Sequence, residues 1–150
     1  MKKTIIIALI CTILGSIFGL NLYRTSYTSI VRAFNEEHLY YFLQEGVYSS
    51  EESLRESIKE LDHKVIEKIN DKYYVYVAIT KDQEVAEKIK NIYKQKNINL
   101  YQKEKVVKNE EFLNNVTQFD LLIKECKTEE EILAIEEVVL ANYEEISKNN

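Results

Sequence analysis

The sequence contains no proline, no tryptophan and only three glycines in 150 residues. These absences exclude collagen-like chains and Pro/Gly-rich low-complexity chains. Eleven tyrosines, five phenylalanines and an apolar fraction of 45% also exclude a disordered acidic tail, because such tails carry too few apolar groups to form a core. We therefore expect one small folded domain with accessory segments.

Cysteine and histidine are scarce as well, with two of each. Cys11 lies in an apolar run and Cys126 in a distant polar region, so we expect no disulfide framework. His38 and His63 are too far apart along the chain to give a metal-ligand spacing. No nucleophile elbow, zinc-protease motif, P-loop or dinucleotide-binding fingerprint occurs, so the sequence predicts neither an enzyme, a metal site nor a cofactor.

The formal net charge is -5, with 20 basic and 25 acidic side chains. An acidic chain is a poor candidate for nucleic-acid binding, which usually relies on a basic surface that releases counterions. The acidity is uneven, because residues 1–22 carry +2, residues 23–107 are neutral and residues 108–150 carry -7. The net negative charge therefore lies in the C-terminal region, which is the part of the chain that most resembles a surface for a protein partner.

The N-terminus has the pattern of a membrane anchor. Lys2 and Lys3 precede an uncharged apolar run from residue 4 to residue 22, whose helical length of roughly 28 Å is close to the thickness of a bilayer core. A cleaved signal peptide is the alternative, but Ile13 and Ile17 occupy positions where a cleavage site needs small residues. We expect an uncleaved single-pass anchor at 1–22.

The positive-inside rule sets the expected orientation. The two lysines and the N-terminal amine outweigh the nearby Arg24, which predicts a cytoplasmic N-terminus in the cell membrane and an extracytoplasmic C-terminal domain. Residues 23–38 are polar and form a short linker between the anchor and that domain.

Residues 39–107 alternate between strand and helix patterns. We expect strands at 39–44, 65–69, 73–79 and from residue 98, with helices at 51–61 and 81–96, the second capped by Thr80. Asn70 and Asp71 predict a tight hairpin turn. The segments 41–61 and 74–93 resemble each other, so this is an internal repeat of a strand that feeds a helix. The order predicts an α+β, ferredoxin-like βαββαβ domain, with a four-stranded antiparallel sheet, both helices on one face and the other face open.

Residues 108–150 predict an acidic helical hairpin. Apolar residues recur at spacings of three and four from Phe112 to Cys126, and again from Ile132 to Ile146. Thr128 and Glu131 form a capping box at the start of the second helix. The apolar stripe has two interpretations: the hairpin folds back on the sheet domain, or the stripe meets another chain.

The candidate ligand-binding residues are aromatic and amide side chains of the sheet. If Leu43, Val75, Val77 and Ile79 face the helices, period-two alternation places the others on the open face: Phe42, Gln44, Tyr74 and Tyr76. Aromatic rings with a few amides suit a neutral carbohydrate. The alternative is that these aromatics pack under the C-terminal hairpin.

The stretch from Leu43 to Tyr48, with its following helix and the echo from Tyr74 to Ile79, resembles the SPOR domain family. Gln44 and Gly46 match the glutamine and glycine of the family's first strand, whereas Glu45, Val47 and Ala78 differ from the usual residues. The resemblance implies a βαββαβ fold and binding to septal peptidoglycan glycan strands, in cell division or sporulation.

We therefore hold two hypotheses. In the first, the chain is a non-catalytic, membrane-anchored protein whose sheet binds peptidoglycan glycan strands at a septum. In the second, it is a scaffold that docks a membrane or envelope protein through the sheet and the C-terminal helices.

Overall fold

The computed structural model describes residues 38–148. The strands are β1 (Leu39–Tyr48), β2 (Val65–Ile69), β3 (Lys72–Thr80) and β4 (Tyr101–Val106). The helices are α2 (Glu51–Ser57), which continues as the 3-10 turn η1 (Ile58–Glu60), then α3 (Gln83–Gln95), α4 (Glu110–Glu125) and α5 (Glu129–Lys148). The chain is thus α+β, with the predicted succession of elements.

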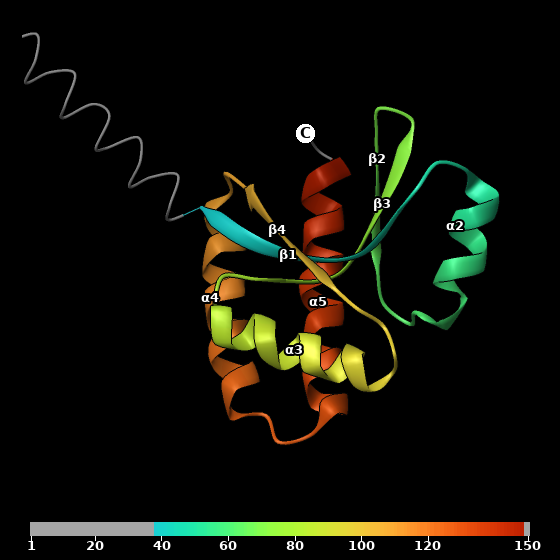
Figure 1. Ribbon diagram of the computed structural model, residues 1–150. Coiled ribbons are helices and arrows are strands. Elements are labelled where there is room, and N and C mark those ends of the chain that lie inside the picture. Colours follow the sequence, from blue (N-terminus) through green and yellow to red (C-terminus); the bar gives the residue numbers. More distant parts are fainter. Residues whose placement is uncertain (1–37, 149–150) are drawn as a thin grey trace, which may run out of the picture. The chain divides into compact units, whose positions relative to one another are not determined.

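The four strands form one antiparallel sheet in the order β2-β3-β1-β4 (Figure 1). The central strands β1 and β3 pair with each other, and β2 and β4 form the two edges. This is the strand order that two interleaved strand-helix-strand units produce, as the internal repeat predicted. The predicted β-hairpin is confirmed, because Asn70 and Asp71 both have positive φ, as a type I′ turn requires.

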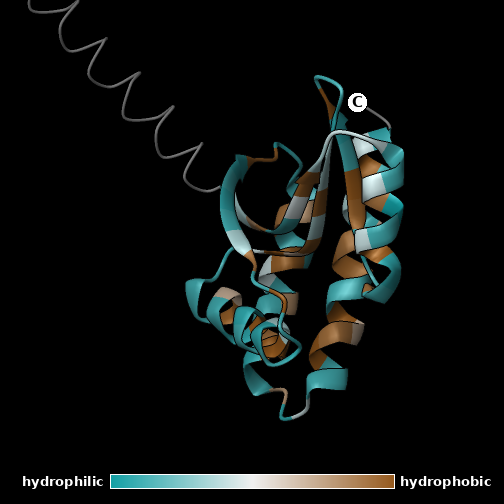
Figure 2. Ribbon diagram, turned by 45° about the vertical axis from the view of Figure 1, so that its right-hand side comes forward, coloured by the Kyte–Doolittle hydropathy of each residue, from teal (hydrophilic) through white to brown (hydrophobic). Residues whose placement is uncertain are grey.

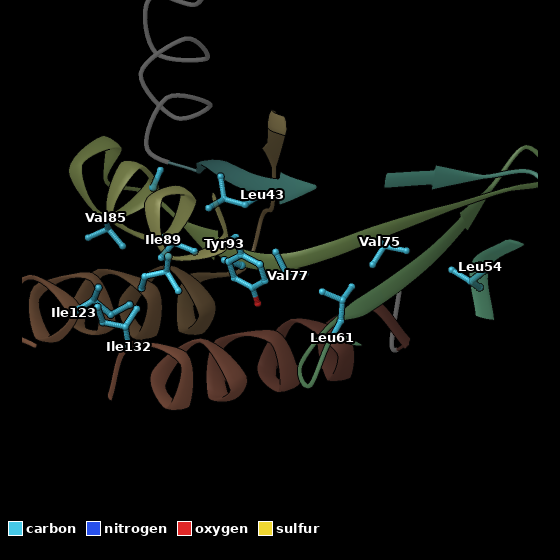
Figure 3. Packing of buried hydrophobic residues seen from close by; sticks show 13 residues of the cluster. Leu43, Leu54, Leu61, Val75, Val77, Val85, Ile89, Tyr93, Ile123 and Ile132 are labelled. Atoms are coloured by element: carbon cyan, nitrogen blue, oxygen red, sulfur yellow. The ribbon is translucent and has the colours of Figure 1, made fainter. Parts of the chain in front are cut away.

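One face of the sheet packs against α2 and α3. Apolar side chains of the two central strands, among them Leu43, Val75 and Val77, contact Leu54 of α2 and the buried stripe of α3 (Figure 3). The ends of α4 and α5 that meet at their connecting loop join the same cluster through Ile123 and Ile132. This cluster is the larger of the two cores of the domain.

The other face is covered, which corrects the expectation of an open face. Helices α4 and α5 run side by side along it (Figure 1), and the ribbon of α5 is mainly hydrophobic toward the strands and hydrophilic outside (Figure 2). Their inward stripe, including Phe112, Val116, Val139 and Tyr143, packs on aromatic residues of β1 and β3. The hairpin therefore folds back on the sheet, because an exposed aromatic face would leave a large apolar area in water.

A bulge in β3 corrects one further expectation. In the β1–β3 register Leu43 pairs with Ala78 and Gln44 with Tyr76, so Val77 is an extra residue that reverses the alternation beyond it. Val77 and Ala78 both belong to the helix-side core, and Ile79 belongs to the hairpin side. The prediction that Ile79 faces the helices was therefore wrong.

The predicted anchor at 1–22 and the predicted linker at 23–38, apart from His38, lie outside the described residues. Among residues 38–148, no helix is long and apolar enough to cross a membrane. The contacts of the chain separate residues 38–150 from the preceding part as a compact unit, and both hydrophobic clusters lie within that unit.

Candidate functional site

Three of the four predicted ligand-binding residues lie together, but under the hairpin. Phe42, Gln44 and Tyr76 are 0%, 5% and 3% exposed, and Tyr74 is half-buried at the margin of the same cluster. The rings of Phe42 and Tyr76 meet edge to face at 5.1 Å, and Phe42 meets Tyr143 of α5 in the same way at 4.9 Å. The sequence pattern thus placed these side chains on the correct face, and the structure fills that face with α5.

The aromatic group already surrounds a cation from the same chain. The Lys105 ammonium, which comes from edge strand β4, lies 4.4 Å from the ring centre of Phe42, 4.9 Å from Tyr76 and 5.5 Å from Tyr143. The negative faces of aromatic rings attract a cation at such distances. We call these three rings, with Lys105 and Glu67, the lysine cage.

Glu67, on the opposite edge strand β2, completes the lysine cage. Its two carboxylate oxygens accept from the Lys105 ammonium at 2.8 and 2.6 Å, and one of them also accepts from the Tyr143 hydroxyl. Burial and the Glu67 charge raise the pKa of Tyr76 to about 12, and the same two causes raise the pKa of Tyr143. Both phenols are therefore neutral hydrogen-bonding groups at physiological pH.

In this arrangement the side chains of Phe42, Gln44 and Tyr76 are not accessible to a ligand in solvent. The side-chain oxygen Oε1 of Gln44 is buried without a hydrogen-bond partner, so the amide that a sugar hydroxyl would meet points into the interior. Two buried acids fasten the hairpin to this face, and their hydrogen bonds reach the end of β3.

The first of these acids is Glu136 of α5. Its Oε2 accepts from the backbone N–H of Ile79 at 3.1 Å, just after the β3 bulge, whereas its Oε1 has no partner. Burial, with a smaller contribution from the nearby charge of Asp120, raises the pKa of Glu136 to about 8, although the hydrogen bond from the Ile79 N–H opposes the shift. At neutral pH the group is therefore largely a neutral carboxylic acid.

The second acid is Asp120 of α4. Its carboxylate accepts from the Thr80 hydroxyl at 2.5 Å and from the backbone N–H of Lys81 at 2.9 Å. Burial raises the pKa of Asp120, and these two hydrogen bonds oppose the shift. Thr80 therefore holds α4 instead of capping α3, and Asp82 provides the N-cap of α3 with bonds to the N–H groups of Glu84 and Val85.

The surface of the hairpin that faces away from the sheet is accessible. Leu121 and Leu122 on α4 and Val138 on α5 are 62%, 54% and 46% exposed, and they are large apolar residues. Two hollows lie between the helices, one lined by apolar residues near their connecting loop and one lined mainly by amides and acids at the other end. We call the two hollows, together with these three exposed residues, the outer groove.

Sequence reasoning did not identify Lys105 and Glu67 as site residues. Both lie on edge strands, where charged residues are expected on solvated faces. The one available signal was that their strands flank the aromatic face, so that long side chains from both edges reach its middle.

Within residues 38–148, no group of three or more His, Cys, Asp or Glu side chains is arranged to hold a metal ion. Comparison of the chain with protein-family descriptions, with curated proteins and with solved structures finds no match.

Proposed function

We propose that this chain is a non-catalytic, membrane-anchored protein of a bacterial envelope, and that its extracytoplasmic domain docks another envelope protein through the outer groove. One observation carries the docking proposal: the inner stripe of the hairpin is consumed by the sheet, yet Leu121, Leu122 and Val138 remain exposed on its outside. Apolar residues that gather on one accessible surface are typical of protein contact sites. The anchor and its orientation rest on the charge and hydropathy of residues 1–24.

Site-specific photo-crosslinking in intact cells tests the docking proposal. A photoreactive side chain at Leu122 or Val138 of the full-length chain should give the same adduct from both positions, since both are exposed apolar residues of the α4–α5 hairpin. Arg55 on α2 and Lys59 on η1 are the controls, because they are exposed positions elsewhere on the domain. Adducts of equal yield from all four positions, or none from the groove, would reject the proposal.

The second candidate is binding of septal peptidoglycan glycan strands, as the SPOR resemblance implies. It is favoured by the grouping of Phe42, Gln44 and Tyr76 on one sheet face, where the period-two alternation placed the candidate contact residues. Because α5 covers these side chains, a glycan reaches them only when the hairpin leaves the sheet. This candidate therefore requires an opened form of the domain.

Co-sedimentation with amidase-treated sacculi tests the second candidate. If the sheet binds glycan, residues 38–150 should sediment with the sacculi, and Gln44→Ala combined with Tyr74→Ala should reduce the bound fraction. Leu122→Ser is the control, since it alters the outer groove and leaves the sheet intact. Absence of sedimentation, or equal sedimentation of both variants and the parent, would exclude glycan binding through the sheet.

A further inference from the structure

We infer that the segment bound in the outer groove is a basic amphipathic helix of the partner protein. This inference rests on the docking function proposed above and adds the chemistry of the occupant.

The groove follows the contact between the antiparallel helices α4 and α5. Near their connecting loop, Leu122, Cys126 and Ile135 line a hollow of about 430 Å³, with Glu125 and Glu131 at its rim. At the other end is a hollow of about 290 Å³ lined by Asn109, Glu111, Phe112, Asn115, Asn142, Glu145 and Ile146. Both hollows are at the small end of the roughly 300–1,000 Å³ of small-molecule sites and are open to solvent, which suits the side chains of a docked segment.

The walls of the groove favour a helical occupant. Both walls are α-helices, whose backbone N–H and C=O groups are paired internally, so the groove offers no edge to which an extended segment can add as a strand. Asn115 and Leu122 lie two turns apart on α4, as do Ile135 and Asn142 on α5, which is roughly 10 Å along the axis. A partner helix with apolar residues at i, i+3 or i+4, and i+7 matches this repeat.

The charges of the groove favour a basic occupant. Four glutamates line the two hollows and no lysine or arginine does. Three of them, Glu111, Glu125 and Glu145, make no ion pair within residues 38–148, whereas Glu131 accepts from the N–H groups of Lys127 and Thr128. Lysine or arginine residues beside the apolar stripe of a partner helix would pair with these rim carboxylates.

The same charges argue against three other occupants. A second copy of the hairpin would bring two regions of net charge -7 together, and like charges across an interface are unfavourable. Anionic lipid and nucleic acid are repelled for the same reason. A basic amphipathic helix is the occupant that both the apolar hollows and their acidic rims would bind.

Peptide binding to residues 38–150 tests the inference. The probe is a fluorescent helical peptide of about five turns with leucines at i, i+3, i+4 and i+7 and lysines on its flanks. The matched peptide has the same leucines and glutamate in place of each lysine. Fluorescence anisotropy should show binding of the basic peptide that weakens with added salt, and at least about tenfold weaker binding of the acidic peptide.

Two double variants locate the binding. Leu122→Ser with Val138→Ser should weaken the basic peptide about tenfold, and Glu125→Gln with Glu145→Gln should weaken it and reduce its salt dependence. Glu52→Gln with Glu56→Gln on α2 is the charge-matched control and should leave binding unchanged. Circular dichroism of each variant verifies that the fold is retained.

The outcomes separate this inference from the docking function. Failure of the basic peptide to bind, or binding that neither groove variant weakens, overturns the inference. Equal binding of the basic and the acidic peptide at the groove would show that the occupant need not be basic, while the docking proposal would stand. Sedimentation equilibrium that shows a dimer lost in the Leu122→Ser, Val138→Ser variant overturns it in favour of a second copy. If a partner is crosslinked in cells but the peptide does not bind, the docking proposal stands and the inference of a basic helix is rejected. If no partner is crosslinked and the peptide does not bind, both proposals are rejected.

Discussion

Glu136 is the residue whose environment differs most from the one its sequence context indicates. It stands in an acidic helix beside Glu137 and reads as part of a solvated face, but its side chain is buried and bonds the Ile79 N–H. Ile79 lies beyond the β3 bulge and beyond the last β2–β3 pair, Val65 with Tyr76, so no residue of β2 pairs with it. A bulge of one residue leaves no trace in the alternation of Tyr and Val in β3, so sequence alone could not place this group.

The raised pKa of Glu136 predicts a pH dependence of stability. An acid with a pKa of 4.5 when unfolded and about 8 when folded holds its proton more tightly in the folded state. Its contribution is therefore fully present below pH 4.5, falls as pH rises and is lost above pH 8. We expect the free energy of unfolding to decline over this range, and Glu136→Gln to become more stable than the parent at pH 8.5, by an amount on the order of a few kcal/mol.

Urea denaturation at pH 5.5 and pH 8.5 measures this effect. The other titratable groups near Glu136 are Asp120 and Tyr93. Both residues are present in the parent and in the variant, so their titration contributes to both pH profiles. Glu130→Gln, an exposed position on the same helix, is the control and should follow the parent at both pH values. If the free energy of unfolding of Glu136→Gln and of the parent changed equally between the two pH values, the raised pKa of Glu136 would be contradicted.

Gly46, the single glycine outside the apolar N-terminal run, shows what a residue pattern can and cannot tell. A lone glycine just after the strand predicted to end at residue 44 suggests a special backbone conformation, but the φ of Gly46 is not positive. A Cβ at this position would lie 2.6 Å from the Tyr48 hydroxyl, which folds back to donate to the Glu45 carboxylate at 2.7 and 2.8 Å. The position requires space rather than an unusual dihedral angle, and that requirement comes from a side chain two residues away.

At the scale of elements, strong periodicity and turn chemistry were sufficient and weak periodicity was not. The hairpin turn, the helical stripe of α3 and the capping box of α5 are confirmed, the last by bonds between Thr128 and Glu131. Strand β4 begins at Tyr101 rather than at residue 98, because Asn97 with positive φ and the residues after it form the connection. The β4 sequence YQKEKV is polar and mostly exposed, so no apolar alternation marks it.

The lysine cage predicts how much Lys105 of edge strand β4 contributes to the free energy of unfolding. Lys105→Met removes the cation and leaves Glu67, whose side chain is only 16% exposed, without its ionic partner. We expect the free energy of unfolding to fall by about 2 kcal/mol, since an uncompensated carboxylate in a mostly dry site is costly. Thermal and urea denaturation of the domain measure the loss.

A double-mutant cycle identifies its cause. Adding Glu67→Gln to Lys105→Met should recover part of the loss, because the second change removes the unpaired charge. Lys103→Met is the matched control, as this residue lies two positions earlier on the same strand and is exposed. Strictly additive effects of the two substitutions would show that the ion pair carries no coupling energy.

At the scale of the whole molecule, the hairpin and the sheet form one structure rather than a domain with an appendage. The sequence identified the apolar stripe of the hairpin but left two destinations for it, since a stripe does not specify its partner. The aromatic face of the sheet was attributed to a ligand for the same reason. The two unmatched surfaces were in fact each other's partners, joined by Phe42, Tyr76 and Tyr143.

Removing the hairpin tests this unity. A chain of residues 38–107 exposes Tyr40, Phe42 and Tyr76, and we expect it to aggregate or to bind a hydrophobic dye, with poorly dispersed amide resonances in NMR spectra. Residues 38–150 are the folded control, and addition of a peptide of residues 108–150 should restore dispersion. A well-folded, monomeric 38–107 would contradict the prediction and would strengthen the glycan-binding candidate.

The packing of α5 on β1 also determines when the core can form during folding. Phe42 in the first strand meets Tyr143 in the last helix across a separation of roughly 100 residues, a contact of high sequence distance. A growing chain therefore holds an apolar central strand with one face uncovered until α5 has been synthesised. Such a chain is vulnerable to aggregation for most of its synthesis, and the period of dependence on chaperones ends only when the last helix docks.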